Sequence, residues 1–290
     1  MDNPFQINYT DEVDSGLVKL AIGGDKKALQ ILIGRHQLFI YNLAIKMTKS
    51  VEDAEDLTQE VLIKAITALT KFEGKSKFRT WLYRITVNHF INTKKSKSEL
   101  KTIDFESYFN SIDNIPVHEL NATEENELKD TIEEIRISCT AGMLLCLNRE
   151  QRMVYILGEM FDIDHNLGSE ILGITAGNFR IRLMRARQDL YNWMNKRCGL
   201  VNKSNPCRCA KKTRAYIDAG IVDPHNLVFN TRHKKKVYEL SGQKAILITH
   251  TVEDLHRNIF RRHPIQEPLT SSKIVNEIFN NKLIKSILDS

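Results

Sequence analysis

The sequence predicts an all-α protein made of two helical domains, a linker between them and a C-terminal extension. Proline is absent between Pro4 and Pro116, and glycine is absent between Gly34 and Gly74, so the residue types that interrupt helices are missing over long stretches. Apolar residues recur there every three or four positions, which is the spacing of a buried helical stripe. The chain has 290 residues, enough for two or three small domains rather than one large core.

Composition indicates a globular chain without membrane insertion. Apolar residues make up 42% and charged residues 27% of the chain, and no apolar run approaches the ~20 residues that span a bilayer. Residues 1–16 contain neither a basic start nor an apolar stretch with a cleavage site, so we expect no secretory signal and a cytoplasmic location. Five cysteines form an odd number, which favours reduced thiols over a disulfide framework.

The first domain, residues 1–97, is predicted to contain three helices. The first has a buried stripe formed by Leu29, Leu32, Ile33, His36, Ile40, Leu43 and Met47. The second is expected to begin at Ser50, paired with Asp53 as in a capping box. Its inner face would consist of Ala54, Leu57, Val61, Ala65, Ala68 and Phe72. After the loop 73–75, we expect Ser76 to cap a third helix whose inward residues are Phe78, Trp81, Leu82 and Ile85.

A linker and a second domain follow. Acids dominate residues 98–135 and the apolar spacing fades there, so we expect a loosely folded connector. In the second domain, residues 136–197, Asn148 with Gln151 predicts one helix start and Thr175 predicts another. A short helix before the Gly173 break and a basic helix after it form a helix-turn-helix pattern. The inner stripe of the basic helix would consist of Phe179, Leu183, Ala186, Leu190 and Trp193.

Charge is strongly segregated along the chain, although the net charge is only +6. Residues 71–97 hold eight Lys or Arg against one acid, residues 99–136 hold eleven acids against three Lys or Arg, and residues 180–214 hold eleven Lys or Arg against one acid. Two basic blocks that flank an acidic one suggest two contacts with a polyanion. The alternative is that each block is a solvated helix face.

The acidic part of the second predicted helix suggests a basic partner. Asp53, Asp56 and Glu60 lie on one helical face, with Gln59 beside them. Like charges at this spacing destabilise a helix by roughly 0.2–0.5 kcal/mol per pair, so a cationic surface that neutralises them is a reasonable inference. A metal or acid–base site is the alternative, but no histidine or cysteine lies near these carboxylates in the sequence.

The block from Lys71 to Arg84 interleaves cations and aromatic residues around Gly74. This mixture suits single-stranded nucleic acid, because cations follow the phosphates while aromatic faces and loop pockets hold unstacked bases. Asn88 lies four residues beyond Arg84, and its amide could read a base edge. In the alternative interpretation the aromatic residues of the block, Phe72, Phe78 and Trp81, belong to the core.

Four segments together resemble the bacterial sigma factors of the extracytoplasmic-function (ECF) group. Residues 53–65 and 71–88 resemble the group's second conserved region, and residues 147–160 and 172–190 resemble its fourth region. The resemblance covers residues 15–97 and 136–196 in the expected order. It implies a protein without catalytic residues or cofactor that binds core RNA polymerase and promoter DNA to start transcription, with an anti-sigma factor as a further candidate partner.

The resemblance also assigns roles to matching residues. The family's polymerase-docking helix corresponds to Asp53, Asp56, Gln59 and Glu60. The segment that melts and captures the minus-ten element corresponds to Lys75, Ser76, Lys77, Phe78, Arg79, Thr80, Trp81, Arg84 and Asn88. The helix that reads the minus-thirty-five element corresponds to Thr175, Asn178, Arg180, Ile181, Arg182, Arg185 and Arg187. Arg185 and Arg187 could instead clamp phosphates.

Two features depart from the family pattern. Leu167-Gly168-Ser169 stands where members commonly carry a Glu-Ile-Ala-like stretch, which leaves the packing of that helix open. Residues 198–290 form an extension beyond the usual end, and its cysteines Cys198, Cys207 and Cys209 could bind zinc with His225 or His233, or be reduced structural thiols. A terminal amphipathic helix that packs on the other domains or binds a regulator is predicted from Ile274, Val275, Ile278, Ile284, Ile287 and Leu288.

Two rival functions remain at this point. A stand-alone helix-turn-helix regulator would use residues 147–195 and leave the acidic helix and the block 71–88 without a role. A nuclease or metal hydrolase would need clustered metal ligands or an acid–base pair beside the basic surface, and the sequence presents none.

Overall fold

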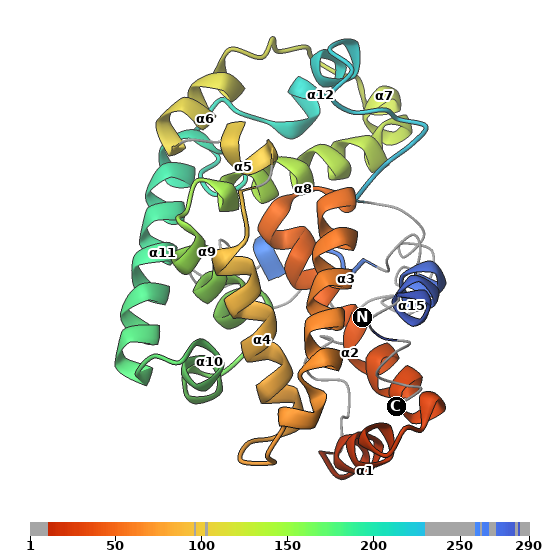
Figure 1. Ribbon diagram of the computed structural model, residues 1–290. Coiled ribbons are helices and arrows are strands. Elements are labelled where there is room, and N and C mark those ends of the chain that lie inside the picture. The colour runs from red at the N-terminus through yellow and green to blue at the C-terminus, as the bar shows by residue number, and fades with distance from the viewer. Residues whose placement is uncertain are drawn as a thin grey trace.

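The computed structural model describes residues 11–95, 97–101, 104–229, 259–261, 263–266, 271–281 and 284. Helices dominate these residues, and the isolated bridge between Cys198 and Cys207 is the one pairing of extended backbone among them. The all-α prediction is therefore confirmed (Figure 1). None of the described helices is both long and apolar enough to cross a lipid bilayer.

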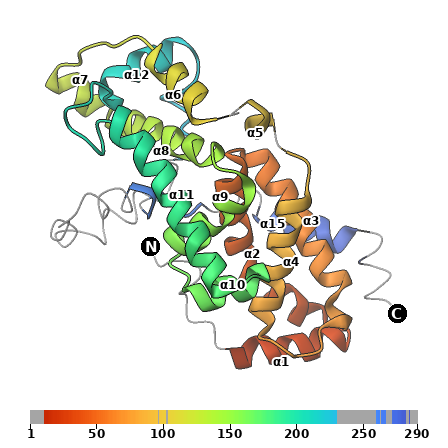
Figure 2. The ribbon, with the colours of Figure 1, turned by 90° about the vertical axis from the view of Figure 1, so that its left-hand side faces the viewer.

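An N-terminal bundle consists of α1 (Asp11–Ile22), α2 (Lys26–Thr48), α3 (Val51–Thr67), the 3-10 turn η1 (Leu69–Lys71) and α4 (Phe78–Asn92). α2 lies at its centre and packs on α1, α3 and α4 (Figures 1 and 2). The predicted stripe of α2 is buried along its whole length, and the Ser50 hydroxyl accepts from the Asp53 amide at 3.2 Å. Both sequence predictions for α2 and α3 are thus confirmed.

The predicted start of α4 is wrong by one residue. Its N-cap is Lys77 and not Ser76, and no side chain caps the helix. Gly74 adopts a positive φ of 69° and turns the chain, and Phe78 then enters the core as the first helical residue. Burial of that aromatic ring therefore sets the helix start without help from a capping hydroxyl.

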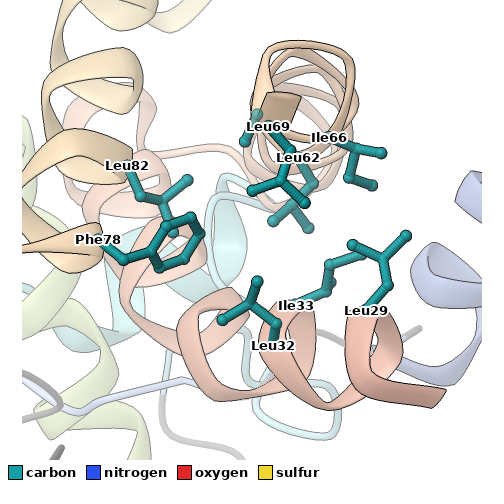
Figure 3. Close-up of a pocket in the computed structure, with 9 residues that line it drawn as sticks. Leu29, Leu32, Ile33, Leu62, Ile66, Leu69, Phe78 and Leu82 are labelled. Carbon is teal, nitrogen blue, oxygen red and sulfur yellow. The ribbon is translucent and has the colours of Figure 1, made fainter. Parts of the chain in front are cut away.

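A small apolar gap remains between α2, α3 and α4 (Figure 3). Its volume of about 20 Å³ is close to that of a single water molecule. Apolar side chains line it throughout, namely Leu29, Leu32, Ile33, Leu62, Ala65, Ile66, Leu69, Phe78 and Leu82. A water there would find no hydrogen-bond partner, so the gap is a packing defect and not a ligand site.

The acidic linker contains three short helices, α5 (Lys97–Lys101), α6 (Phe105–Asp113) and α7 (Ala122–Glu127). Its acids serve as helix caps: Asp104 accepts from the Ser107 amide at 2.7 Å, and Glu124 forms a capping box with Asn121. Phe109 of α6 stacks on Trp193, with ring centroids 5.9 Å apart. The segment is thus more ordered than its composition predicts, because it packs on other elements.

The second helical unit consists of α8 (Lys129–Leu145), α9 (Arg149–Tyr155) with its π-helical continuation η2 (Ile156–Met160), α10 (His165–Leu172) and α11 (Ala176–Arg197). The predicted caps are present, since Asn148 accepts from the Gln151 amide at 2.9 Å and Thr175 from the Asn178 amide at 3.1 Å. Gly173 has a φ of 64° and separates α10 from α11. The predicted helix-turn-helix geometry is confirmed.

Gly168 explains how this turn packs despite its unusual sequence. A Cβ atom at Gly168 would collide with the Phe179 ring, so glycine lets that ring lie directly on α10. Gly158 makes similar room for Leu183 and Phe179. The segment Leu167-Gly168-Ser169, which departs from the family pattern, therefore allows α10 and α11 to pack closely.

Replacing Gly168 with alanine should lower the free energy of unfolding by roughly 1–3 kcal/mol, because overpacking displaces the Phe179 ring. Gly177→Ala is a matched control, since a Cβ there meets only the Thr175 hydroxyl at 3.8 Å. Alanine in a helix should stabilise the chain at that position by a few tenths of a kcal/mol or more. Urea denaturation measures both effects, and equal midpoints for the two variants would contradict this account of the turn.

The extension returns to both helical units. α12 (Cys209–Asp218) packs on α8, and the Lys212 ammonium donates to the carbonyls of Ile112 and Ile115 at 2.7 and 2.8 Å. Residues 263–266 contact α2 and α8, and α15 (Ser271–Asn280) packs on α3 and α2. The predicted terminal helix is confirmed over α15, where Ile274 and Ile278 are buried. α15 ends at Asn280, so the buried Ile284 lies beyond it. The Val275 side chain, Ile287 and Leu288 lie outside the described residues.

Candidate nucleic-acid and partner interfaces

Asp53, Asp56 and Gln59 lie on one face of α3, as the helical spacing predicted. Asp56 is exposed, while Asp53 and Gln59 are half-buried. Partial burial and the neighbouring carboxylates of Glu52 and Asp53 raise the pKa of Asp56. No ion pair joins Asp53 or Asp56 to a base within the described part of the chain. This face therefore carries concentrated negative charge that the rest of the structure leaves uncompensated.

Glu60 differs from the other predicted acids because a histidine holds it. His89 Nε2 lies 2.8 Å from Glu60 Oε2, and the Lys64 ammonium lies 2.7 Å from His89 Nδ1. An ammonium can only donate, so Nδ1 accepts and Nε2 carries the proton that binds Glu60. Burial and the charge of Lys64 lower the pKa of His89, which keeps this ring neutral at pH 7. Glu60 is thus directed toward α4.

The predicted nucleic-acid block divides into exposed cations and buried residues. Lys75, Lys77, Arg84 and Asn88 are exposed, Ser76, Arg79 and Trp81 are half-buried, and Phe78 and Thr80 lie in the core. The Trp81 ring lies 5.3 Å from the Phe72 ring and 5.6 Å from the Phe78 ring, measured between centroids. The core interpretation therefore holds for the aromatic residues, and Phe78 and Thr80 shape the loop without an exposed surface of their own.

An open cavity of about 390 Å³ lies beside Asn88 at the end of α4. Five residues with polar side chains line it together with Ile85, namely Lys64, Asn88, His89, Asn92 and Thr93. The two amide side chains each offer a donor and an acceptor, and Lys64 adds a cation at the rim. A cavity of this size and polarity suits a small planar group with hydrogen-bonding edges.

The outer face of α11 presents a stripe of candidate readers. Asn178, Ile181, Arg182 and Arg185 are spaced at i, i+3, i+4 and i+7, and all except the half-buried Arg182 are exposed. Arg180 is exposed beside this stripe, while the Thr175 hydroxyl is engaged as the N-cap of the helix. Arg182 Nη1 lies 2.7 Å from Glu150 Oε2, so a carboxylate already competes for this guanidinium.

Arg187 has a structural partner that the sequence did not reveal. Its guanidinium binds Glu159, whose side chain is only 1% exposed and is also approached by Arg261 at 3.7 Å. A buried carboxylate needs a cation close by, since an unpaired one is strongly destabilising. The ion pair with Glu159 therefore competes with the DNA contact that was predicted for Arg187.

Helices of the two basic regions lie against each other. α10 packs on α4, and Arg84 Nη2 donates to the Glu170 carbonyl at 2.8 Å. Figures 1 and 2 show α10 and α11 on one side of α4 and α3 on the other. The structure therefore brings Arg84 next to the helix-turn-helix, while the acidic face of α3 lies apart from it.

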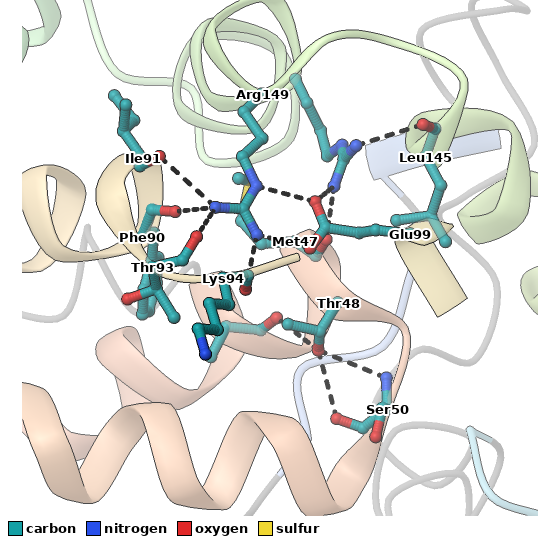
Figure 4. A network of polar contacts seen from close by, with 12 residues as sticks. Met47, Thr48, Ser50, Phe90, Ile91, Thr93, Lys94, Glu99, Leu145 and Arg149 are labelled. Carbon is teal, nitrogen blue, oxygen red and sulfur yellow. Dashed lines mark hydrogen bonds and ion pairs between the residues drawn. The ribbon is translucent and has the colours of Figure 1, made fainter. Parts of the chain in front are cut away.

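A buried polar network, unseen in the sequence, joins the two helical units (Figure 4). The Arg152 guanidinium lies 2.8 Å from Glu99 and donates to the carbonyls of Met47, Leu144, Leu145 and Leu147 at 2.6–3.1 Å. Arg149 also pairs with Glu99, at 2.6 Å, and donates to carbonyls at the C-terminal end of α4. In the sequence both arginines look like surface residues of a capped helix, so helical spacing gave no signal for this junction.

The three cysteines of the extension are free thiols near the end of α11. Burial raises the pKa of Cys207 to about 11, and it also raises the pKa values of Cys198 and Cys209. Zinc requires thiolates, and the described residues include no group of three or more His, Cys, Asp or Glu arranged to hold a metal. The zinc alternative finds no support among them, while His233 lies outside the described residues.

Comparison with known proteins identifies a family that this chain resembles. Residues 32–99 match the family model for sigma-70 region 2, a range that includes most of α2 and all of α3 and α4. The chain is 30% identical over 189 residues to the ECF RNA polymerase sigma-E factor of Escherichia coli, which covers 63% of this chain and 93% of that protein. It is 28% identical over 183 residues to the RNA polymerase sigma-H factor of Pseudomonas aeruginosa, with 62% and 92% covered.

A solved structure of CnrH in complex with the cytosolic domain of CnrY also matches. It covers 63% of this chain and 97% of that chain, with 19% sequence identity and a TM-score of 0.45. Each of the two sigma factors leaves more than a third of this chain without a counterpart, which agrees with the predicted extension.

Proposed function

This chain belongs to the ECF family of RNA polymerase sigma factors, and from that premise we propose which of its surfaces perform each step of initiation. It directs promoter-specific transcription initiation through RNA polymerase and is a non-catalytic subunit. We assign residues 1–97 to region 2, 98–135 to a linker, 136–197 to region 4 and 198–290 to a C-terminal extension. The match of residues 32–99 to sigma-70 region 2 supports the first of these boundaries.

Core RNA polymerase would bind the face of α3 that carries Asp53, Asp56 and Gln59, with Glu60 at its edge. The observation that supports this assignment is the cluster of carboxylates on this face, where partial burial and the neighbouring acids raise the pKa of Asp56. A basic surface on the polymerase would relieve the repulsion. Such complementarity gives specificity and a fast association rate.

The minus-ten element would be captured by the loop before α4 and by the exposed side of α4. Lys75, Lys77 and Arg84 would follow the phosphates, while Asn88 and the polar cavity beside it would take an unstacked base. We assign Phe78, Thr80 and Trp81 a supporting role, because two of them are buried and the third packs on Phe72.

The minus-thirty-five element would be read by α11 in the major groove. Asn178, Ile181, Arg182 and Arg185 form the stripe that would face the bases, and Arg180 would contact the backbone.

Family membership also suggests an anti-sigma partner and a cytoplasmic location. A stand-alone regulator would leave the acidic face of α3 without a ligand.

Run-off transcription with core polymerase on genomic fragments tests the assignment of α11. Arg182→Ala should weaken promoter binding by the holoenzyme roughly 5- to 150-fold, since a specific base contact contributes about 1–3 kcal/mol. Polymerase binding should be unchanged, because α11 lies on the opposite side of α4 from α3.

Glu150→Ala is the matched control for Arg182→Ala. It removes the carboxylate that lies 2.7 Å from Arg182, so promoter binding should be equal to or tighter than that of the wild type. Arg187→Ala should instead lower stability, because it leaves Glu159 without one of its cations. If Arg182→Ala and Glu150→Ala gave the same promoter affinity, the base-reading role of Arg182 would be refuted.

A further inference from the structure

The extension is anchored to region 2 immediately before its last described helix. The Asn42 side chain and the Gln266 backbone exchange two hydrogen bonds, both 2.8 Å long. Phe260 is fully buried and its ring meets the Tyr155 ring edge-on, with centroids 5.2 Å apart. Four residues separate Gln266 from Ser271, the first residue of α15. This short tether keeps α15 at a high effective concentration beside the bundle.

α15 packs through an apolar stripe onto α3 and α2. Ile274 and Ile278 are one helical turn apart, and their side chains are 3% and 0% exposed. Phe279 is half-buried against the same core. Figures 1 and 2 show the helix alongside α3. Burial of two isoleucines accounts for most of the stability of this contact.

The helix also binds a residue of the proposed polymerase site. Gln59 Nε2 donates to Glu277 Oε2 over 3.4 Å, so the amide that would face polymerase faces α15 instead. Packed helices lie about 8–10 Å apart, which leaves no space for a second protein against the same side of α3. α15 and a polymerase surface that contacts Gln59 therefore exclude each other.

The charges around this contact make it reversible. Glu277 brings another carboxylate to a helix that already carries Asp53, Asp56 and Glu60, and its one described bond to that face is long. Carboxylates brought onto one surface repel each other, and this repulsion opposes docking of α15. A basic partner would gain from the same carboxylates, so polymerase has an electrostatic advantage over α15 at this surface.

We propose that α15 is an internal competitor of core RNA polymerase: it lies against the Gln59 edge of the docking face of α3 in the free chain and leaves when polymerase binds. This inference rests on the proposed function of that face. The sigma factor would thereby carry its own antagonist, and its apparent affinity for polymerase is reduced by the fraction of molecules in which α15 is docked.

The test compares two full-length variants that each introduce an aspartate into α15. Ile278→Asp buries a charge in the contact and should release the helix, so the Kd for core polymerase should fall about tenfold if roughly one molecule in ten is open in the wild type. Asn280→Asp is the control, because Asn280 is exposed in the same helix and its Kd should stay at the wild-type value. A folded Ile278→Asp variant with unchanged Kd would overturn the proposal.

A measurement on the wild-type chain covers the case in which Ile278→Asp fails to fold. Hydrogen exchange of the amides in residues 271–280 should accelerate when core polymerase is added, because the helix is displaced. Unchanged or stronger protection of this segment in the complex would refute the competition.

One further substitution distinguishes an error in the proposed docking face from an error in the proposed competition by α15. Asp56→Lys, made in the wild-type and Ile278→Asp backgrounds, should weaken polymerase binding in both. If Asp56→Lys has no effect in either background, the assignment of α3 is wrong. If it weakens binding while Ile278→Asp leaves the Kd unchanged, the docking face stands and the competition is refuted.

Discussion

Replacing Arg152 with methionine is expected to lower the free energy of unfolding by about 3–5 kcal/mol, the largest stability effect that we predict for a single substitution. The guanidinium is 3% exposed and satisfies Glu99 together with four backbone carbonyls. Methionine fills much of the same volume but donates no hydrogen bond, so these acceptors would be buried without partners. Glu99 would keep Arg149, which limits the loss.

The two tryptophans allow this effect to be followed in both halves of the molecule. Trp81 lies in α4, and Trp193 lies in α11 stacked against Phe105 and Phe109. Fluorescence-detected denaturation of Trp81→Phe and Trp193→Phe variants should show both halves unfolding at lower denaturant when Arg152→Met is added. Arg180→Met is the control, because Arg180 is exposed. Equal midpoints for Arg152→Met and Arg180→Met would show that the network contributes nothing.

Charge reversal at Asp56 is expected to have the largest effect on function. Asp56→Arg should weaken association with core polymerase by at least about 30-fold, since like charges brought together across an interface cost several kcal/mol. In the isolated chain the same change should be neutral or stabilising by a few tenths of a kcal/mol, because it removes repulsion among the carboxylates of α3. Opposite signs for binding and stability would separate a docking residue from a structural one.

The raised pKa of Asp56 gives this prediction a pH dependence. The folded chain holds the proton of Asp56 more tightly than the unfolded chain does, so partial burial and repulsion of its charge lower stability above the raised pKa, and this penalty disappears at more acidic pH. Asp56→Asn should therefore stabilise the chain at pH 7 and have little effect under acidic conditions. Thermal denaturation at several pH values measures this difference, and a stabilisation that grew toward acidic pH would contradict it.

Local sequence signals predicted most of the helices. Ser50, Asn148 and Thr175 each cap the helix that follows, and Gly173 takes the positive φ that ends α10. These signals act over three or four residues, so a single sequence contains them fully. The buried stripes of α2 and α11 are likewise visible as spacing, because each helix has one inner face.

Contacts between distant segments could not be predicted in this way. Glu99 reads as one of many acids in a linker, yet it is buried between Arg149 and Arg152. Composition predicted a loose connector because acids rarely build a core, but several of these acids cap short helices. The short helices of the linker are ordered because they pack on α8 and α11, which lie far along the chain.

The sequence predicted which helix face carries each candidate residue, but not whether another part of the chain already contacts that residue. Helical spacing placed Arg187 on the outer side of α11, and it could not indicate that a buried Glu159 holds it. It also placed Gln59 beside the acids of α3, but gave no sign that Glu277 would reach it. Residues 198–290 supply part of this coverage, and periodicity within one helix carries no information about them.

The hydrogen bond from Arg84 to Glu170 limits what this compact form can reach along DNA. The minus-ten and minus-thirty-five elements are about 25 base pairs apart, which is roughly 85 Å of duplex. α11 has 22 residues and is therefore roughly 33 Å long, while α10 holds it directly beside α4. If α4 and α11 bind the two elements as proposed, a chain folded in this way could not reach both, and the helix-turn-helix would have to move away from α4 during initiation.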